Sequence, residues 1–172
     1  THVAGRAQLG LATINATSGA FDGFMALPIS GMHNGGTTFV LKLDVTPDGS
    51  RLFAIGNFTN VGGQVRDQVV ALDINGASAA VSPWTTTFYN STCSSSFNTF
   101  MRDLDVSPDG AFVVMSTTGA YRGTSTSCDT VARFEVRSTA ADVRPTWVDY
   151  TGGDTTYAVA VTGEAVYVGG HF

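Results

Sequence analysis

The chain has 172 residues, which suffice for one ordinary domain with a sizeable core. Charged residues make up only 13% of it, and the formal net charge is −5. We predict no nucleic-acid partner, because phosphate binding needs clustered Lys and Arg, and no membrane span, because no apolar run approaches the ~20 residues that cross a bilayer.

Short strands separated by turn residues are predicted along the whole chain. The strand at 39–45 (FVLKLDV) alternates apolar and polar side chains, as a half-buried strand does. TPDG at 46–49 then supplies a turn, because proline fixes φ and glycine accepts a positive φ. No stretch has the periodicity of a helix. In chain order the predicted strands are 6–14, 39–45, 51–58, 68–74 and 79–84, followed by a second hairpin at 104–114 and a last strand at 165–172.

The sequence repeats itself with a period near 60 residues. Three independent anchors share this period, which indicates structural repeats. The recurring aromatic residues should lie in the core. The anchors are the hairpin phrase LDV at 43–45, 104–106 and (as VAV) 159–161, the strand phrases RAQLGLATIN from Arg6 and RDQVVALDIN from Arg66, and the aromatic residues Phe24, Trp84 and Trp147.

Four antiparallel strands in each unit are typical of a β-propeller blade. Such a small sheet buries both faces only against its neighbours, so the repeats should stack. A β-sandwich would explain the strands but not their shared period. We predict an all-β chain of about three blade equivalents, a partial propeller formed by the single segment 1–172. The predicted units are 1–38 (the second half of a blade), 39–99 (a blade), 100–155 (a blade) and 156–172 (the first half of a blade).

Three blade equivalents do not close a ring, since closed propellers have roughly four to eight blades. The chain begins and ends within the same motif, and joining Phe172 to Thr1 would nearly restore it. We therefore expect the open ends to pack either on the remaining blades of a longer protein, which is the interpretation we favour, or on a second copy of the chain.

The motif GNFTNVGG at 56–63, followed by Arg66 and by VALD at 70–73, resembles the delta-60 repeat family of secreted actinobacterial proteins. The likeness extends over nearly the whole chain, since VYVGGHF at 166–172 is similar too. The resemblance implies a β-propeller scaffold and secretion, and it brings no catalytic residues. The third copy departs from the pattern, because STTG at 116–119 replaces Gly-x-Phe-Thr.

Cys93 and Cys128 are the two cysteines, and both lie in polar segments that are typical of loops. In the predicted topology the loops 85–100 and 117–130 fall on the same face of the molecule. We predict a disulfide between them, worth about 3–4 kcal/mol, with two free thiols as the alternative. A disulfide favours an oxidising compartment, so we predict a secreted, extracellular protein, with the cell surface as a possible location.

The same face of the predicted propeller gathers the longest loops, and loops on a rigid scaffold are where binding residues tend to lie. Aromatic side chains beside Asn and Arg suit a glycan or protein ligand. The alternative is that the aromatic residues cover blade edges while Arg66 holds its own loop. The candidate binding residues are His33, Asn34, Arg66, Tyr89, Tyr121 and Arg122.

No catalytic residue, metal site or cofactor is predicted. The sequence lacks a Gly-x-Ser-x-Gly elbow, a phosphate loop and a His-Glu-x-x-His motif. Asp48 and Asp109 fit turn positions better than calcium ligands. We therefore interpret the chain as a non-enzymatic extracellular scaffold or recognition module. The alternatives are a carbohydrate-binding, lectin-like propeller, or part of a larger secreted enzyme whose catalytic groups lie outside this chain.

Overall fold

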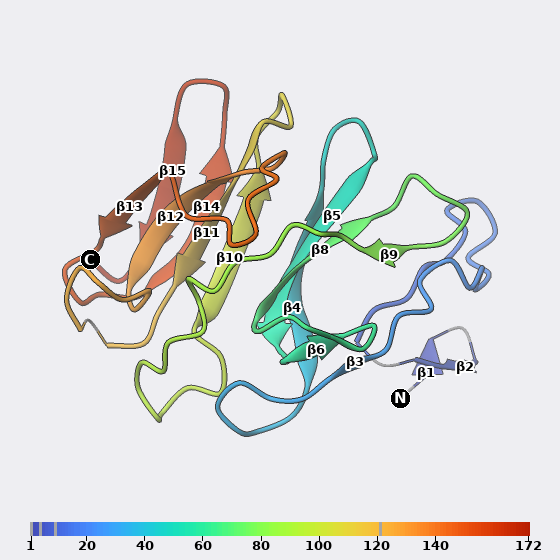
Figure 1. The fold of residues 1–172 in the computed structure, drawn as a ribbon, viewed down its shortest axis with the longest axis horizontal. Coiled ribbons are helices and arrows are strands. Elements are labelled where there is room, and N and C mark those ends of the chain that lie inside the picture. Colours follow the sequence, from blue (N-terminus) through green and yellow to red (C-terminus); the bar gives the residue numbers. More distant parts are fainter. Residues whose placement is uncertain (1, 4, 9, 121) are drawn as a thin grey trace.

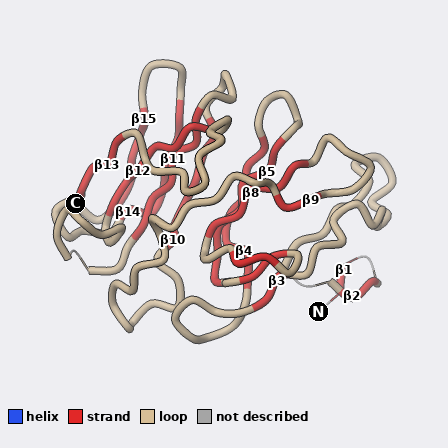
Figure 2. Tube along the Cα trace, viewed as in Figure 1, coloured by secondary structure: helices blue, strands red, loops and turns tan. Residues whose placement is uncertain are grey.

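The computed structural model describes residues 2–3, 5–8, 10–120 and 122–172. Over these residues the fold is all-β, with antiparallel sheets of two to four strands and no helix (Figure 2). The larger sheets stand side by side, with the N-terminus and the C-terminus at opposite ends of the molecule (Figure 1). The predicted all-β class is confirmed.

The first large sheet, here called the first sheet, contains the predicted hairpin at 39–58. Its turn forms as expected: Gly49 has a φ of 66°, and Asp48 Oδ1 accepts hydrogen bonds from Thr46 Oγ1 at 2.7 Å and Ser50 N at 3.0 Å. The strands, in spatial order, are β4 (Phe39–Val45), β5 (Arg51–Asn57), β8 (Val69–Asp73) and β9 (Ala80–Val81).

The second large sheet, here called the second sheet, repeats this arrangement. Its turn uses the same chemistry: Asp109 Oδ1 accepts hydrogen bonds from Ser107 Oγ at 2.6 Å and Ala111 N at 3.0 Å, and Gly110 has a φ of 69°. The repeated phrase thus forms the same hairpin twice, in two separate sheets. The strands, in spatial order, are β10 (Met101–Val106), β11 (Phe112–Thr117), β12 (Thr130–Glu135) and β13 (Trp147–Tyr150).

A C-terminal hairpin follows, formed by β14 (Thr156–Val161) and β15 (Val166–Gly170). The remaining strands are short, and the strand predicted at 6–14 forms only as β2 (Arg6–Ala7). A strand persists where a neighbour supplies ladder hydrogen bonds, and among the described residues this segment pairs with the two-residue β1 and makes one isolated bridge, Ile14 with Phe21. The short strands are β1 (His2–Val3), paired with β2, and β3 (Ile29–Ser30), β6 (Asn60–Val61) and β7 (Gln64–Val65), which form a three-stranded sheet.

The first and second sheets pack face to face on one apolar cluster. Phe53, Leu104 and Phe134 are each 0% exposed within it. Trp84 is 2% exposed, and its ring lies 5.1 Å from that of Phe53 and 6.0 Å from that of Phe134. Its indole Nε1 donates a hydrogen bond to Glu135 O at 3.0 Å. The prediction that Trp84 belongs to the core is confirmed.

The first strands of the two sheets and of the hairpin lie in a row, because β10 packs against both β4 and β14. One carboxylate crosses each interface. Asp44 Oδ2 accepts a hydrogen bond from Val106 N at 2.8 Å, and Asp105 Oδ2 accepts one from Val161 N at 2.6 Å. The two aspartates are equivalent in the repeat, and so are the two valines, so the same contact between sheets is made twice.

Candidate functional site

The predicted disulfide is present. Cys93 and Cys128 are bonded, are 1% and 0% exposed, and pack with Phe100. Gly119 lies against this cluster with a φ of 132°, and a Cβ there would come within 2.5 Å of the Cys93 Cβ. The disulfide therefore ties the loops 85–100 and 117–130 together, and the close approach needs a glycine.

His33 is a buried residue that anchors its loop. Its side chain is 3% exposed, and Nδ1 lies 2.8 Å from Asp67 Oδ1. Its ring packs edge-on against Phe100, with the centroids 5.0 Å apart. The other nitrogen, Nε2, is buried and has no hydrogen-bond partner among the described residues. The side chain faces the protein interior, so it offers no donor to a ligand at the surface.

Asn34 and Arg66 also hold loops in place. The Asn34 amide donates hydrogen bonds to Ser94 O at 3.2 Å and Phe97 O at 2.8 Å, and so joins its loop to the disulfide loop. The Arg66 guanidinium donates to Ser82 O at 3.0 Å and, within its own loop, to Gln64 Oε1 at 3.0 Å. This is the alternative role that the sequence allowed for Arg66.

The remaining candidates are Tyr89, Tyr121 and Arg122. Tyr89, expected at the surface, is 1% exposed and packs on Phe88 and Phe134 in the main cluster. Burial raises the pKa of its phenol well above the ordinary value. Tyr121 lies outside the described residues, and Arg122 is exposed. The polar residues around Tyr89 predicted an exposed loop, but Phe88 and Tyr89 both pack in the main cluster.

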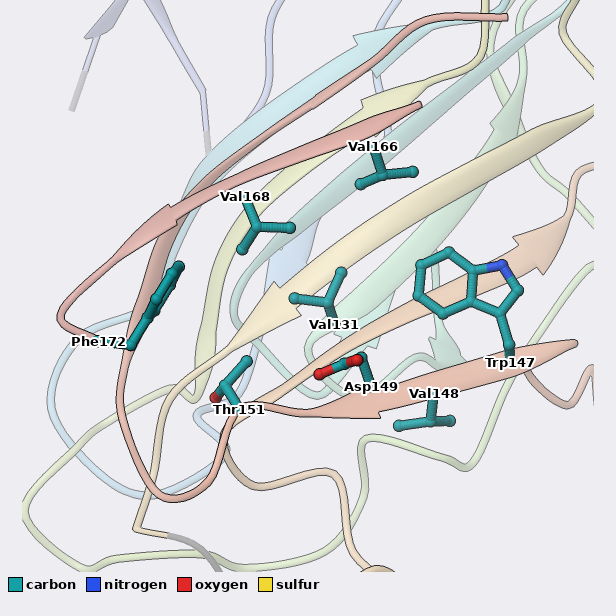
Figure 3. A pocket seen from close by; sticks show the side chains of 8 residues that line it. All are labelled: Val131, Trp147, Val148, Asp149, Thr151, Val166, Val168 and Phe172. Carbon is teal, nitrogen blue, oxygen red and sulfur yellow. The ribbon is translucent and has the colours of Figure 1, made fainter. Parts of the chain in front are cut away.

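An apolar groove, which the sequence did not predict, runs between the second sheet and the C-terminal hairpin (Figure 3). Its volume is about 700 Å³. Val131 of β12 lies on one side, and Val166 and Val168 of β15 lie on the other. These three valines belong to the apolar cluster between the hairpin and the second sheet. The other lining residues are Trp147, Val148, Asp149, Thr151 and Phe172.

The prediction that Trp147 lies in the core is wrong. This residue keeps the repeat position of Trp84, yet it is 37% exposed rather than buried. Trp84 is covered by β12 of the adjoining sheet, whereas the sheet next to Trp147 has only β14 and β15. The sequence marks Trp147 as an apolar residue like Trp84, but only the packing reveals that its side chain is uncovered.

Polar groups in and near the groove are mostly engaged within the protein. The Thr151 hydroxyl donates to Asp154 O at 2.6 Å, whereas Asp149 is exposed. Away from the groove lining, between β4 and β10, Lys42 Nζ lies 2.8 Å from Asp103 Oδ1, and this hydrogen bond raises the pKa of Lys42. Burial raises the pKa of Asp105 in the same row.

Metal-binding clusters and long apolar helices were sought among the described residues. There, no group of three or more His, Cys, Asp or Glu side chains is placed to hold a metal ion. The same residues include no helix with the length and apolarity needed to cross a membrane.

No protein-family model matches the chain. A search of curated proteins likewise finds no match. The groove and the contacts between sheets therefore carry the functional argument.

Proposed function

We propose that the chain is a non-enzymatic extracellular scaffold whose two large sheets and C-terminal hairpin are propeller-type repeats. The single observation that carries this proposal is the repeated hydrogen bond between sheets, which Val106 N donates to Asp44 and Val161 N donates to Asp105. A sheet that meets its two neighbours through equivalent residues belongs to a stack of like units. The delta-60 resemblance is in line with the same proposal.

The disulfide supports the extracellular part of the proposal. Disulfides persist in oxidising compartments and are uncommon in the cytosol. Burial of both sulfur-bearing residues, at 1% and 0% exposure, makes the bond part of the fold. Thiol titration of the protein purified from its natural source should find no free thiol, in native and in denatured protein alike.

The propeller geometry is tested by the rotation between neighbouring sheets. A propeller requires the rotation from the first sheet to the second to equal that from the second sheet to the hairpin. Residual dipolar couplings in solution measure both rotations on the whole chain. Clearly unequal rotations would contradict the proposal.

The carbohydrate-binding alternative places a glycan ligand at the loop face. Of its two aromatic residues, Tyr89 is buried and Tyr121 lies outside the described residues. A glycan array probed with the chain is the direct test of this alternative.

A further inference from the structure

Large apolar side chains are exposed at both ends of the row of sheets. On β4 they alternate with Lys42 and Asp44, whose side chains contact the second sheet, so they point away from that sheet. On β15 the exposed Tyr167 alternates with valines that line the groove. The end residues are Leu41, Leu43 and Val45 on the first sheet, and Trp147, Tyr157, Tyr167 and Phe172 at the C-terminal end.

Tyr167 and Phe172 on the C-terminal hairpin each have a buried equivalent inside the molecule. RLFAIGNF at 51–58 aligns with AVYVGGHF at 165–172. Phe53 is 0% exposed where Tyr167 is 61% exposed, and Phe58 is 0% exposed where Phe172 is 70% exposed. Phe53 is covered by the second sheet, whereas Phe58 is buried with Leu11 and Met25 on the opposite face of the first sheet. The exposed position of Tyr167 therefore marks a place where a further sheet fits.

The first sheet has the complementary face. Leu43 and Val45 are 44% and 37% exposed, whereas their equivalents Leu104 and Val106 are 0% and 7% exposed. Leu104 is buried in the same cluster as Phe53. The face of β4 that bears Leu43 and the face of β15 that bears Tyr167 are therefore complementary, and they lie at opposite ends of the row of sheets.

The open edge of β15 lies beside the groove. β5 pairs with strands on both sides, and so does β11, whereas β15 pairs only with β14 among the described strands. Inside the molecule a third strand, β12, covers Trp84 and accepts its indole hydrogen bond. The groove beside Trp147 is the corresponding space, so it fits a third strand added to β15.

The N-terminal segment of the chain resembles a third strand in sequence. Residues 6–15 match 66–75, which contain the third strand β8, at Arg, Gln, Ile and Asn. Their small residues Gly10 and Ala12 fall at the positions of Val70 and Leu72, which are buried on the face of the first sheet that is turned away from the second sheet. Much of the segment is exposed, including Ile14 at 54%.

We propose that a second copy of the chain docks head to tail on this end. Its residues 6–15 add to β15 as a third strand in the groove, and its exposed β4 face covers Tyr167. The first copy makes the same contact on the C-terminal end of the second copy. The two contacts give a closed dimer of about six sheets, within the range of closed propellers. The inference rests on the proposed stacking of like sheets and goes beyond it by naming the partner.

Sedimentation equilibrium of the intact chain tests this assembly. A mass of twice 17.9 kDa is expected at tens of micromolar, an order-of-magnitude range typical of modest interfaces. Hydrogen exchange should show concentration-dependent protection of 6–15 and 166–170. A chain that stays monomeric overturns the proposal.

Charge variants locate the interface. Leu43→Lys and Tyr167→Glu should each raise the dimer dissociation constant at least tenfold, because each places a charge in both contacts. Val65→Lys is the matched control, since Val65 is 71% exposed and lies on β7, a strand that forms neither of the two contacts. Mixing the Leu43→Lys chain with the Tyr167→Glu chain should restore a dimer, because one contact is then unchanged and the other pairs opposite charges.

The remaining outcomes are decisive as well. A dimer that both charge variants leave intact uses another surface and overturns the proposal. So does a monomer whose groove amides become protected only by an added oligosaccharide, which would assign the groove to a glycan. If the dimer fails but the two inter-sheet rotations are equal in solution, the scaffold proposal stands without this partner.

Discussion

Two regions of the molecule are built from equivalent residues but differ in exposure. The interface between the first and second sheets is buried, whereas the C-terminal end, with the hairpin and the groove beside it, is exposed. Phe53 and Trp84 are 0% and 2% exposed at the interior interface, and Tyr167 and Trp147 are 61% and 37% exposed at the end. Residue type is nearly the same in both places. Burial here depends on whether a neighbouring sheet is present.

The largest effect should separate these two regions directly. Phe53→Ala removes a fully buried ring from the main cluster and should lower the free energy of unfolding by about 3–5 kcal/mol. The equivalent Tyr167→Ala should change it by less than about 0.5 kcal/mol in dilute, monomeric protein. Urea unfolding followed by tryptophan fluorescence measures both values. Equal losses would mean that the hairpin face is covered in the monomer.

Removing the disulfide should weaken the loop region by a slightly smaller amount. The bond closes a separation of 35 residues, so Cys93→Ser combined with Cys128→Ser should cost about 3–4 kcal/mol. Urea unfolding of the oxidised protein, the reduced protein and the double variant gives the comparison. Reduced protein and double variant should agree, and no loss in either would contradict a structural role.

The contact between first strands should contribute less. Asp44→Ala removes the acceptor of Val106 N and should cost about 1–2 kcal/mol, as for a hydrogen bond to a charged group. Asp44→Asn is the matched control, because its amide oxygen can still accept that hydrogen bond. A loss in Asp44→Asn as large as in Asp44→Ala would assign the effect to charge instead.

The smallest effect should appear in the pH dependence. Burial raises the pKa of Asp105 above its ordinary value near 3.9, helped by the neighbouring charge of Asp44. The folded chain then holds this proton more tightly, so the stability it adds is present below about pH 4 and lost as the pH rises through the folded pKa. Asp105→Asn should remove this component of the pH dependence. Urea midpoints between about pH 3 and 7 give the measurement, and an unchanged curve would argue against the assignment.

Local chemistry made the hairpins and the disulfide predictable. In the Pro-Asp-Gly turns the aspartate side chain fixes the backbone by accepting a hydrogen bond from the N–H two positions later, as Asp48 does from Ser50 N. The repeat period then separated the strands into distinct sheets. Cys93 and Cys128 were predicted as a pair because both fall in loops on one face.

The candidate binding residues were harder to predict, because polar sequence does not distinguish an exposed loop from a loop folded against the core. His33 and Tyr89 both lie in such segments and are both buried, one against Asp67 and one against Phe134. Their contacts join residues more than thirty positions apart, at separations of 34 and 45 residues along the chain. No local pattern reports contacts of that length.

The sequence by itself determined the all-β class, the repeated hairpin and the period of about 60 residues, because alternation, turn residues and self-similarity are properties of neighbouring positions. Only the tertiary structure decided which copies of a repeated residue are covered. Trp84 and Trp147 occupy the same place in their repeats, and the free energy of burial depends on the sheet that packs beside each one.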